Sequence, residues 1–111
     1  MQFMLKDETV ILLILETIGK IRLFTTEIQN VEAFEKDIKS FDATMMNFIV
    51  LGESVGKLSE QFKDLHSNID WQKIYDFRNV LAHDYFGIDA AEVWEIIQKH
   101  LPKLKAELES I

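Results

Sequence analysis

The feature that most constrains the fold of this chain is the helical spacing of its apolar residues, which glycine and proline rarely interrupt. From Asp7 to about Asn30, apolar side chains recur at the spacing of one face of an α-helix. The chain has one proline and four glycines, too few for the many turns of an all-β fold. We therefore predict an all-α fold, an up-and-down bundle of four to five helices.

A second long apolar repeat predicts the middle of this bundle. A short helix is expected over residues 31–40, and Ser40 is a suitable N-cap for a long helix that continues to Phe62. Gly52 and Gly56 interrupt the long helix, at a cost of roughly 1 kcal/mol each relative to alanine. Close approach of another helix would explain both glycines, as would mere tolerance.

The second half of the chain contains clear start and stop signals. Residues 63–68 are polar and predict a loop, after which Asp70 is expected to cap one helix and Asp89 the next. The segment 84–88 between these two helices contains a glycine and predicts a break. Pro102 falls inside the last helix and predicts a kinked C-terminal helix.

The first helix also bears on assembly. Ile11, Leu12 and Leu15 extend its apolar surface around the helix, and a helix that is apolar on nearly all sides must be covered on more than one side. A chain of 111 residues forms one domain by the usual relation between length and domain number. We expect residues 1–111 to form a single helical domain that pairs as a homodimer.

Composition excludes several classes of protein. The chain has no cysteine, which rules out disulfides, zinc–thiolate sites and cysteine nucleophiles and fits a reducing cytoplasm. The apolar run from Val10 to Leu15 is far shorter than the ~20 residues of a membrane span. The first five residues lack the basic lead of a signal peptide. A cytoplasmic protein without membrane contact is expected.

The charge balance counts against a simple nucleic-acid binder. The net charge is −7, whereas proteins that grip phosphate backbones usually carry a basic face. Asp7, Glu8 and the acidic run 32–37 are expected to be solvated. Any action on RNA must therefore depend on a local group of basic side chains or on a basic partner.

The segment from Arg78 to Tyr85 concentrates the polar chemistry of the chain. There are only two arginines and three histidines, and Arg78 precedes His83 by five residues, where a helix is expected to end. Functional residues tend to gather at such helix–loop junctions. We identify Arg78 and His83 as candidate catalytic residues, with Asn79 and Asp84 as supporting residues.

Helix geometry limits how these residues can act together. At about 100° per residue, Asn79 and His83 lie on one face, where the amide can orient the imidazole. Arg78 lies about 140° from His83 around the helix axis. The two share a site only if the helix ends between them or if a second chain takes part.

Cleavage of a phosphodiester without a metal ion needs a base, an acid and a cation. One chain offers a single well-placed histidine, whereas a two-fold dimer offers two histidines and two arginines. Histidine titrates near neutral pH, so one copy can be neutral while the other is protonated, and arginine binds phosphate through two parallel hydrogen bonds. Two copies of the chain would therefore supply every group needed for a composite site that cleaves RNA by attack of the 2′-hydroxyl.

Each candidate also has a purely structural interpretation. A histidine near a helix C-terminus is favoured by the helix dipole, and an arginine beside aromatic residues often only packs its stem. Glu53, next to Gly52, can support the site through an ion pair or can lie on a solvated face. His66, His83 and His100 are too far apart in sequence for a local metal motif, so neither a metal nor another cofactor is expected.

The order and spacing of several motifs resemble the HepT-like branch of the HEPN domain family, over nearly the whole chain. The matching motifs are Gly52-Glu53, Trp71, Arg78-Asn79, Leu81-Ala82-His83-Asp84-Tyr85-Phe86, Asp89, Val93-Trp94 and Leu101-Pro102. Two positions depart from the family, since Ser54 and Phe77 stand where alanine and methionine are common. Both differences should affect packing more than chemistry.

The resemblance implies a dimeric HEPN-like domain over residues 1–111 that acts as a metal-independent endoribonuclease toxin. Arg78 and His83 would be catalytic, supported by Asn79. The family is commonly paired with a minimal nucleotidyltransferase (MNT) antitoxin, which is thought to adenylylate the tyrosine at the position of Tyr85. The alternative is a non-catalytic accessory subunit of a minimal nucleotidyltransferase that presents substrate or nucleotide.

Overall fold

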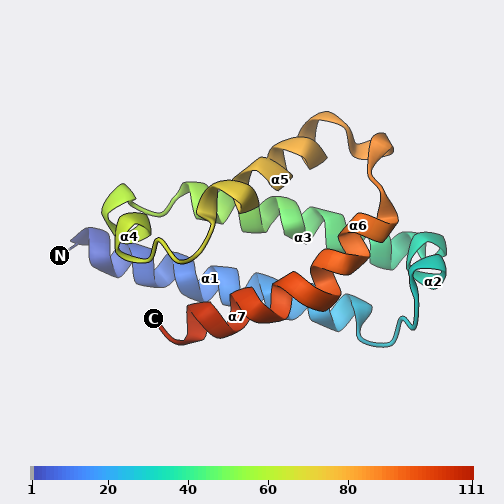
Figure 1. Cartoon of the computed structure of the whole chain (residues 1–111), viewed down its shortest axis with the longest axis horizontal. Helices are drawn as coiled ribbons and strands as arrows, with labels where there is room; N and C mark the ends of the chain where they lie inside the picture. Colours follow the sequence, from blue (N-terminus) through green and yellow to red (C-terminus); the bar gives the residue numbers. More distant parts are fainter. Residues whose placement is uncertain (1) are drawn as a thin grey trace.

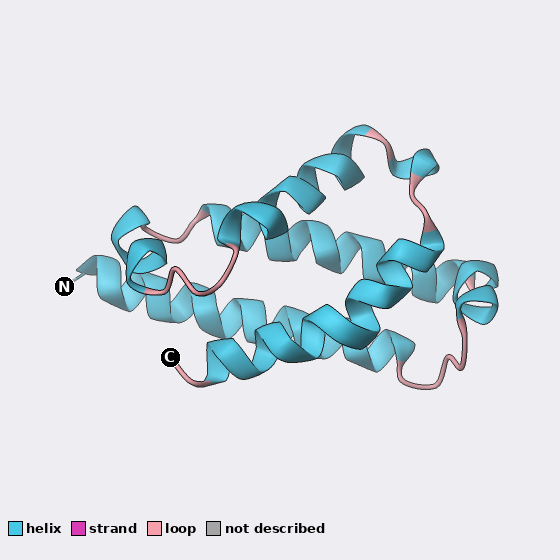
Figure 2. Cartoon of the chain, in the orientation of Figure 1, coloured by secondary structure: helices cyan, strands magenta, loops and turns pink. Residues whose placement is uncertain are grey.

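Four long helical segments alternate in direction and form the body of the molecule (Figure 1). The computed structural model describes the backbone of residues 2–111 and the side chains of residues 6–111. The elements are α1 (Gln2–Thr25), α2 (Val31–Lys36), α3 (Ile38–Gly56), α4 (Glu60–Leu65), α5 (Trp71–His83), the 3-10 turn η1 (Tyr85–Gly87), α6 (Ala90–Glu95), the π-helical turn η2 (Ile96–His100) and α7 (Leu101–Glu109). Residues 2–111 contain no strand, and loops occupy the connections (Figure 2). The all-α fold is confirmed.

The core is built mainly from α1, α3, α5 and the segment from α6 to α7. The buried apolar side chains that α1 contributes are Val10, Ile11, Ile14, Ile18 and Ile21. Because α1 packs along α3 and also contacts α7, two sides of its wide apolar surface are covered by its own chain. Leu12 and Leu23 stay 68% and 69% exposed on its outer side.

The first two helix boundaries differ from those expected. α1 ends at Thr25, and Asn30 starts the next helix, because its side-chain oxygen accepts a hydrogen bond from the backbone N–H of Ala33 at 2.9 Å. Asp37, rather than Ser40, caps α3. The Asp37 carboxylate accepts both the N–H and the hydroxyl of Ser40, at 3.1 and 3.0 Å, so the better acceptor sets the boundary.

The long middle helix is shorter than expected, and the polar segment after it is partly helical. α3 ends at Gly56, and Ser59 begins α4 by accepting the N–H of Phe62 at 3.1 Å. Asp7 supports this start from α1, since its carboxylate accepts the N–H and hydroxyl of Ser59 at 2.8 and 2.7 Å. Asp7 is only 1% exposed, so the expectation that it is solvated was wrong.

Three other signals in the sequence are confirmed. Asp70 caps α5 through the N–H of Lys73 at 3.0 Å, and Asp89 caps α6 through the N–H of Ala91 at 2.9 Å. Pro102 stands at the start of α7, directly after the π-helical turn η2. Since proline has no N–H to donate, the regular backbone hydrogen bonds of the helix are interrupted there. The last helix bends at this point (Figure 1).

The two glycines of α3 mark where α5 crosses it. A Cβ atom built on Gly52 would lie 2.2 Å from Cβ of Arg78, and one on Gly56 would lie 3.1 Å from the ring of Tyr75. At Gly52 the neighbour is the root of a side chain, which cannot move without its helix. Close approach of another helix is therefore the correct explanation for Gly52.

None of the helices within the described residues is long and apolar enough to cross a membrane.

Replacing Gly52 with alanine is expected to lower the free energy of unfolding by about 1–3 kcal/mol, because overpacking outweighs the gain in helix propensity. Gly19 of α1 provides the matched control, since a Cβ there would meet no atom within 4 Å. Gly19→Ala should raise stability by up to about 1 kcal/mol. Urea unfolding of both variants measures the difference, and a Gly52→Ala protein as stable as Gly19→Ala would contradict the packing argument.

Candidate active site

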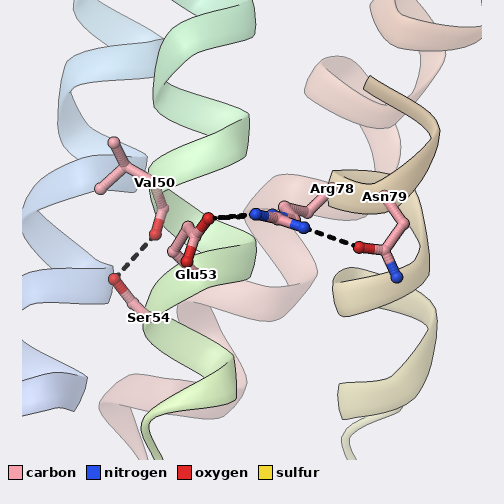
Figure 3. A network of polar contacts seen from close by, with 5 residues as sticks. All are labelled: Val50, Glu53, Ser54, Arg78 and Asn79. Atoms are coloured by element: carbon pink, nitrogen blue, oxygen red, sulfur yellow. Dashed lines mark hydrogen bonds and ion pairs between the residues drawn. The ribbon is translucent and has the colours of Figure 1, made fainter. Parts of the chain in front are cut away.

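Arg78 is held between α3 and α5 by two side chains (Figure 3). Its Nε donates to Oε1 of Glu53 at 3.0 Å, and its Nη2 donates to the same carboxylate oxygen. Its Nη1 donates to Oδ1 of Asn79 at 2.9 Å. Glu53 follows Gly52, so the close helix crossing at Gly52 brings this carboxylate within reach of the guanidinium.

These contacts leave part of the guanidinium free. Arginine has five N–H donors, of which Glu53 takes two and Asn79 takes one, so one donor stays available on each terminal nitrogen. The Arg78 side chain is 25% exposed and that of Glu53 is 50% exposed. Such a solvated ion pair adds at most about 1 kcal/mol to stability. Its main effect is to orient a cation that can still bind an anion.

The two departures from the family pattern are accommodated by packing. Ser54 is 2% exposed, and its hydroxyl donates to the carbonyl oxygen of Val50 at 2.8 Å (Figure 3). The added hydroxyl is thus satisfied inside α3. Phe77 packs edge-on against Phe48, with ring centroids 5.3 Å apart. Neither residue contacts the guanidinium of Arg78 through a hydrogen bond.

His83 lies apart from this cluster. It is the last residue of α5 and is exposed, and no hydrogen bond or ion pair joins its ring to another side chain in residues 6–111. The oxygen of Asn79 is engaged by Arg78, so it does not orient the imidazole within one chain. The structure brings Arg78, Asn79 and Glu53 together and leaves His83 separate.

The separation follows from the length of α5. The helix continues through His83, so Arg78 and His83 stay about 140° apart around its axis and about 7.5 Å apart along it. Arg78 points toward α3, whereas His83 faces solvent. One chain does not direct both side chains at the same point.

Asp84 shapes the turn that follows His83. Its N–H donates to the carbonyl of Val80 at 2.9 Å, and its carbonyl accepts the N–H of Gly87 at 3.1 Å. The Asp84 carboxylate covers Gly87 so closely that a Cβ atom there would lie 2.3 Å from Oδ2. The role that the structure gives Asp84 is to close the turn over Gly87, which has no side chain.

Tyr85 turns back onto α3. Its hydroxyl donates a hydrogen bond to Oδ1 of Asp42, and its ring meets Phe41 edge-on with centroids 6.5 Å apart. Burial, then the hydrogen bond from the hydroxyl to Asp42 and the charge of that carboxylate, raise the pKa of Tyr85 from 10.0 to about 12. The hydroxyl that the resemblance marks for modification is therefore protonated and already engaged.

The sequence did not single out Asp42. It is one of 19 acidic residues, lies 43 positions before Tyr85, and has no local motif around it. Only the tertiary structure shows that Asp42 and Tyr85 meet.

No group of three or more histidine, aspartate or glutamate side chains that could hold a metal ion is found in the part of the chain that the structure describes.

Comparison with known proteins gives a consistent set of relatives. A family model described as "Ribonuclease HepT-like" matches residues 14–111. A protein of Thermococcus cleftensis named "Probable ribonuclease HepT" is 34% identical over 98 residues, which cover 88% of this chain and 88% of that relative. A protein of Methanocaldococcus jannaschii, named as a candidate RNase, is 30% identical over 98 residues, covering 88% and 89%.

One relative is much longer than this chain. It is a second Methanocaldococcus jannaschii protein, whose name joins a gamma-glutamylcyclotransferase and a candidate RNase, and it is 31% identical over 95 residues. The matched segment covers 86% of this chain but only 42% of that relative. No solved structure matches the chain significantly. The family match extends from the middle of α1 to the last residue, and the chain belongs to the HepT-like ribonuclease family.

Proposed function

We propose that this chain is a metal-independent endoribonuclease toxin whose active site forms between two copies of the chain. The observation that carries the proposal is the arrangement on α5. Arg78 is anchored toward α3 with two donors free, and His83 is exposed on another side of the same helix. One chain does not direct both side chains at one phosphate, whereas a two-fold pair of α5 helices can.

The proposed chemistry uses the two histidines in different protonation states. The neutral His83 of one copy removes the proton of a ribose 2′-hydroxyl, and the oxygen attacks the adjacent phosphorus. The protonated His83 of the second copy donates a proton to the leaving 5′-oxygen. The products are a cyclic 2′,3′-phosphate and a 5′-hydroxyl end. Arg78 stabilises the charge that develops on the phosphorane.

An open groove beside α5, lined by both apolar and charged side chains, supports the dimer. The groove encloses about 520 Å³ between α5 and the η2–α7 segment, with Phe48 and Leu51 at its floor. Val80 of α5 lines it and is 54% exposed. Val80 and His83 are three residues apart and therefore share a helix face. A second copy seated in the groove would therefore approach the face of α5 that carries His83.

The acidic charge of the chain limits how RNA is held. With a net charge of −7, we propose that the dimer contacts only a few phosphates, through the two Arg78 side chains, instead of along an extended basic face. Each phosphate contact on a single strand contributes a slope of about −0.7 to the dependence of log affinity on log salt. Binding should therefore depend only weakly on salt.

The proposed cellular setting is a cytoplasmic toxin–antitoxin pair with a minimal nucleotidyltransferase, which transfers AMP to Tyr85. Support comes from the chemistry of that position. An adduct on the Tyr85 oxygen would replace the proton that Asp42 accepts and would bring a phosphate close to a carboxylate. Like charges at such a distance repel. Modification would therefore disturb the turn next to His83.

The central test is cleavage of RNA by the purified protein in EDTA. Activity should persist in EDTA, and His83→Ala and Arg78→Ala should each lower it by at least about a hundredfold, because each removes a group needed in the transition state. Denaturing gels and identification of the cyclic phosphate measure this outcome.

The chain offers a matched control for the arginine. Arg22 is the other arginine and lies exposed on α1, so Arg22→Ala should retain full activity. Full activity in both Arg78→Ala and His83→Ala would end the proposal. A wild-type protein that binds a nucleotidyltransferase tightly but cleaves no RNA would instead establish the accessory-subunit alternative.

The groove can be tested separately from the chemistry. Val80→Asp places a charge in the groove and should convert a dimer of 13.0 kDa chains into monomers that no longer cleave RNA, because burying an unpaired charge is costly. Leu65 of α4 is 70% exposed but lies outside the groove, so Leu65→Asp should stay dimeric. Sedimentation velocity distinguishes the two. A dimeric, active Val80→Asp protein would rule out the groove as the interface.

Subunit mixing tests whether both histidines are needed in one site. When wild-type and His83→Ala chains are co-refolded in equal amounts, activity per total chain should fall to about a quarter, because only a quarter of random two-fold pairs are fully wild type. Chains that act independently would retain about half. The latter result would exclude a site shared between two copies.

A further inference from the structure

The segment between α5 and α6 carries His83 but is held by very few side chains. Of residues 82–87, five are exposed, and Tyr85 is the exception. Phe86 is fully exposed. The next fixed points are Leu81, which is 1% exposed, and Ile88, which packs against the core. Tyr85 is therefore the one side chain within 82–87 that ties the turn to the body of the molecule.

The hold that Tyr85 provides depends on α3. Its ring meets Phe41 edge-on, and its hydroxyl donates to the carboxylate of Asp42. A hydrogen bond from a neutral donor to a charged acceptor is among the stronger ones in proteins. Asp42 is itself exposed, so its carboxylate has little packing function. The raised pKa of Tyr85 means that the donor proton stays in place across the neutral range.

We propose that Asp42 is a positioning residue, which acts through the Tyr85 hydroxyl to hold the turn 84–88 on α3 and thereby fixes His83 for catalysis. The catalytic part of this inference rests on the proposed ribonuclease function. Helix ends fray when nothing holds the chain beyond them, and His83 is the terminal residue of α5. Without the contact, the end of α5 is no longer held, and the backbone that carries the imidazole moves with it.

The experiment compares Asp42→Ala, Asp42→Asn, Tyr85→Phe and the double variant Asp42→Ala/Tyr85→Phe. The first readout is amide hydrogen exchange at Gly87 and Ile88, whose N–H groups close the turn through the carbonyls of Asp84 and Tyr85. Asp42→Ala and Tyr85→Phe should each accelerate exchange by about tenfold, the scale of a lost charge-assisted hydrogen bond.

The second readout is RNA cleavage. Asp42→Ala and Tyr85→Phe should each lower kcat by about tenfold while KM changes by less than about twofold, since the contact orients a reacting group and does not bind substrate. The kcat of the double variant should be no lower than that of either single variant, because both single variants and the double variant remove the same contact. Asp42→Asn keeps an acceptor oxygen and should have a smaller effect.

A third readout follows the phenol itself. Titration of the Tyr85 absorbance, taken as the difference between each protein and its Tyr85→Phe counterpart, should show a pKa that falls from about 12 toward 10.0 in Asp42→Asn. Asp64 of α4, another exposed aspartate, provides the matched control. Asp64→Ala should leave exchange, kcat and the titration unchanged.

The outcomes separate this inference from the proposed function. Unchanged exchange in Asp42→Ala, faster exchange with unchanged kcat, or losses that multiply in the double variant would each overturn the positioning role. If the wild-type protein cleaves no RNA, the proposed function fails. The exchange data then decide alone whether Asp42 holds the turn, with acceleration in both single variants supporting it and no acceleration overturning it.

Discussion

The packing of α5 on α3 depends on the absence of a side chain at Gly52. The root of Arg78 occupies the space that a Cβ atom would need, so the two helix backbones come as close as a glycine permits. This approach also places Glu53, the next residue of α3, beside the guanidinium. One steric constraint thus sets both the position of α5 and the orientation of its only arginine.

The two proposed catalytic groups are held in very different ways. Arg78 is fixed by Glu53 and Asn79, which suits a cation that must stabilise charge without reorganising. His83 lies at the exposed end of α5, where a base or acid has access to substrate and to a second chain. The Tyr85–Asp42 contact compensates for this exposed position by holding the turn that follows.

Contacts between distant parts of the chain connect helices that would otherwise meet only through apolar packing. Asp7 reaches from α1 to the first turn of α4 across 52 positions, and Tyr85 reaches α3 across 43. Both acceptors are carboxylates in an acidic chain, and both receive hydroxyl donors. Part of the negative charge of the chain thus serves as hydrogen-bond acceptors, which define where α4 begins and where the turn at Tyr85 lies.

The sequence by itself determined what depends on neighbours along the chain. Helical periodicity, the caps at Asp70 and Asp89, and the break before Pro102 are local, because helix hydrogen bonds span only four or five residues. The Arg78–His83 motif and the resemblance to the family were also evident from the sequence alone. Only the tertiary structure decided which side chains meet across helices: Glu53 with Arg78, Asp42 with Tyr85, and Asp7 with Ser59. Such pairs form where helices cross or pack together. The pattern of residues along one helix does not indicate which residues of another helix it will meet.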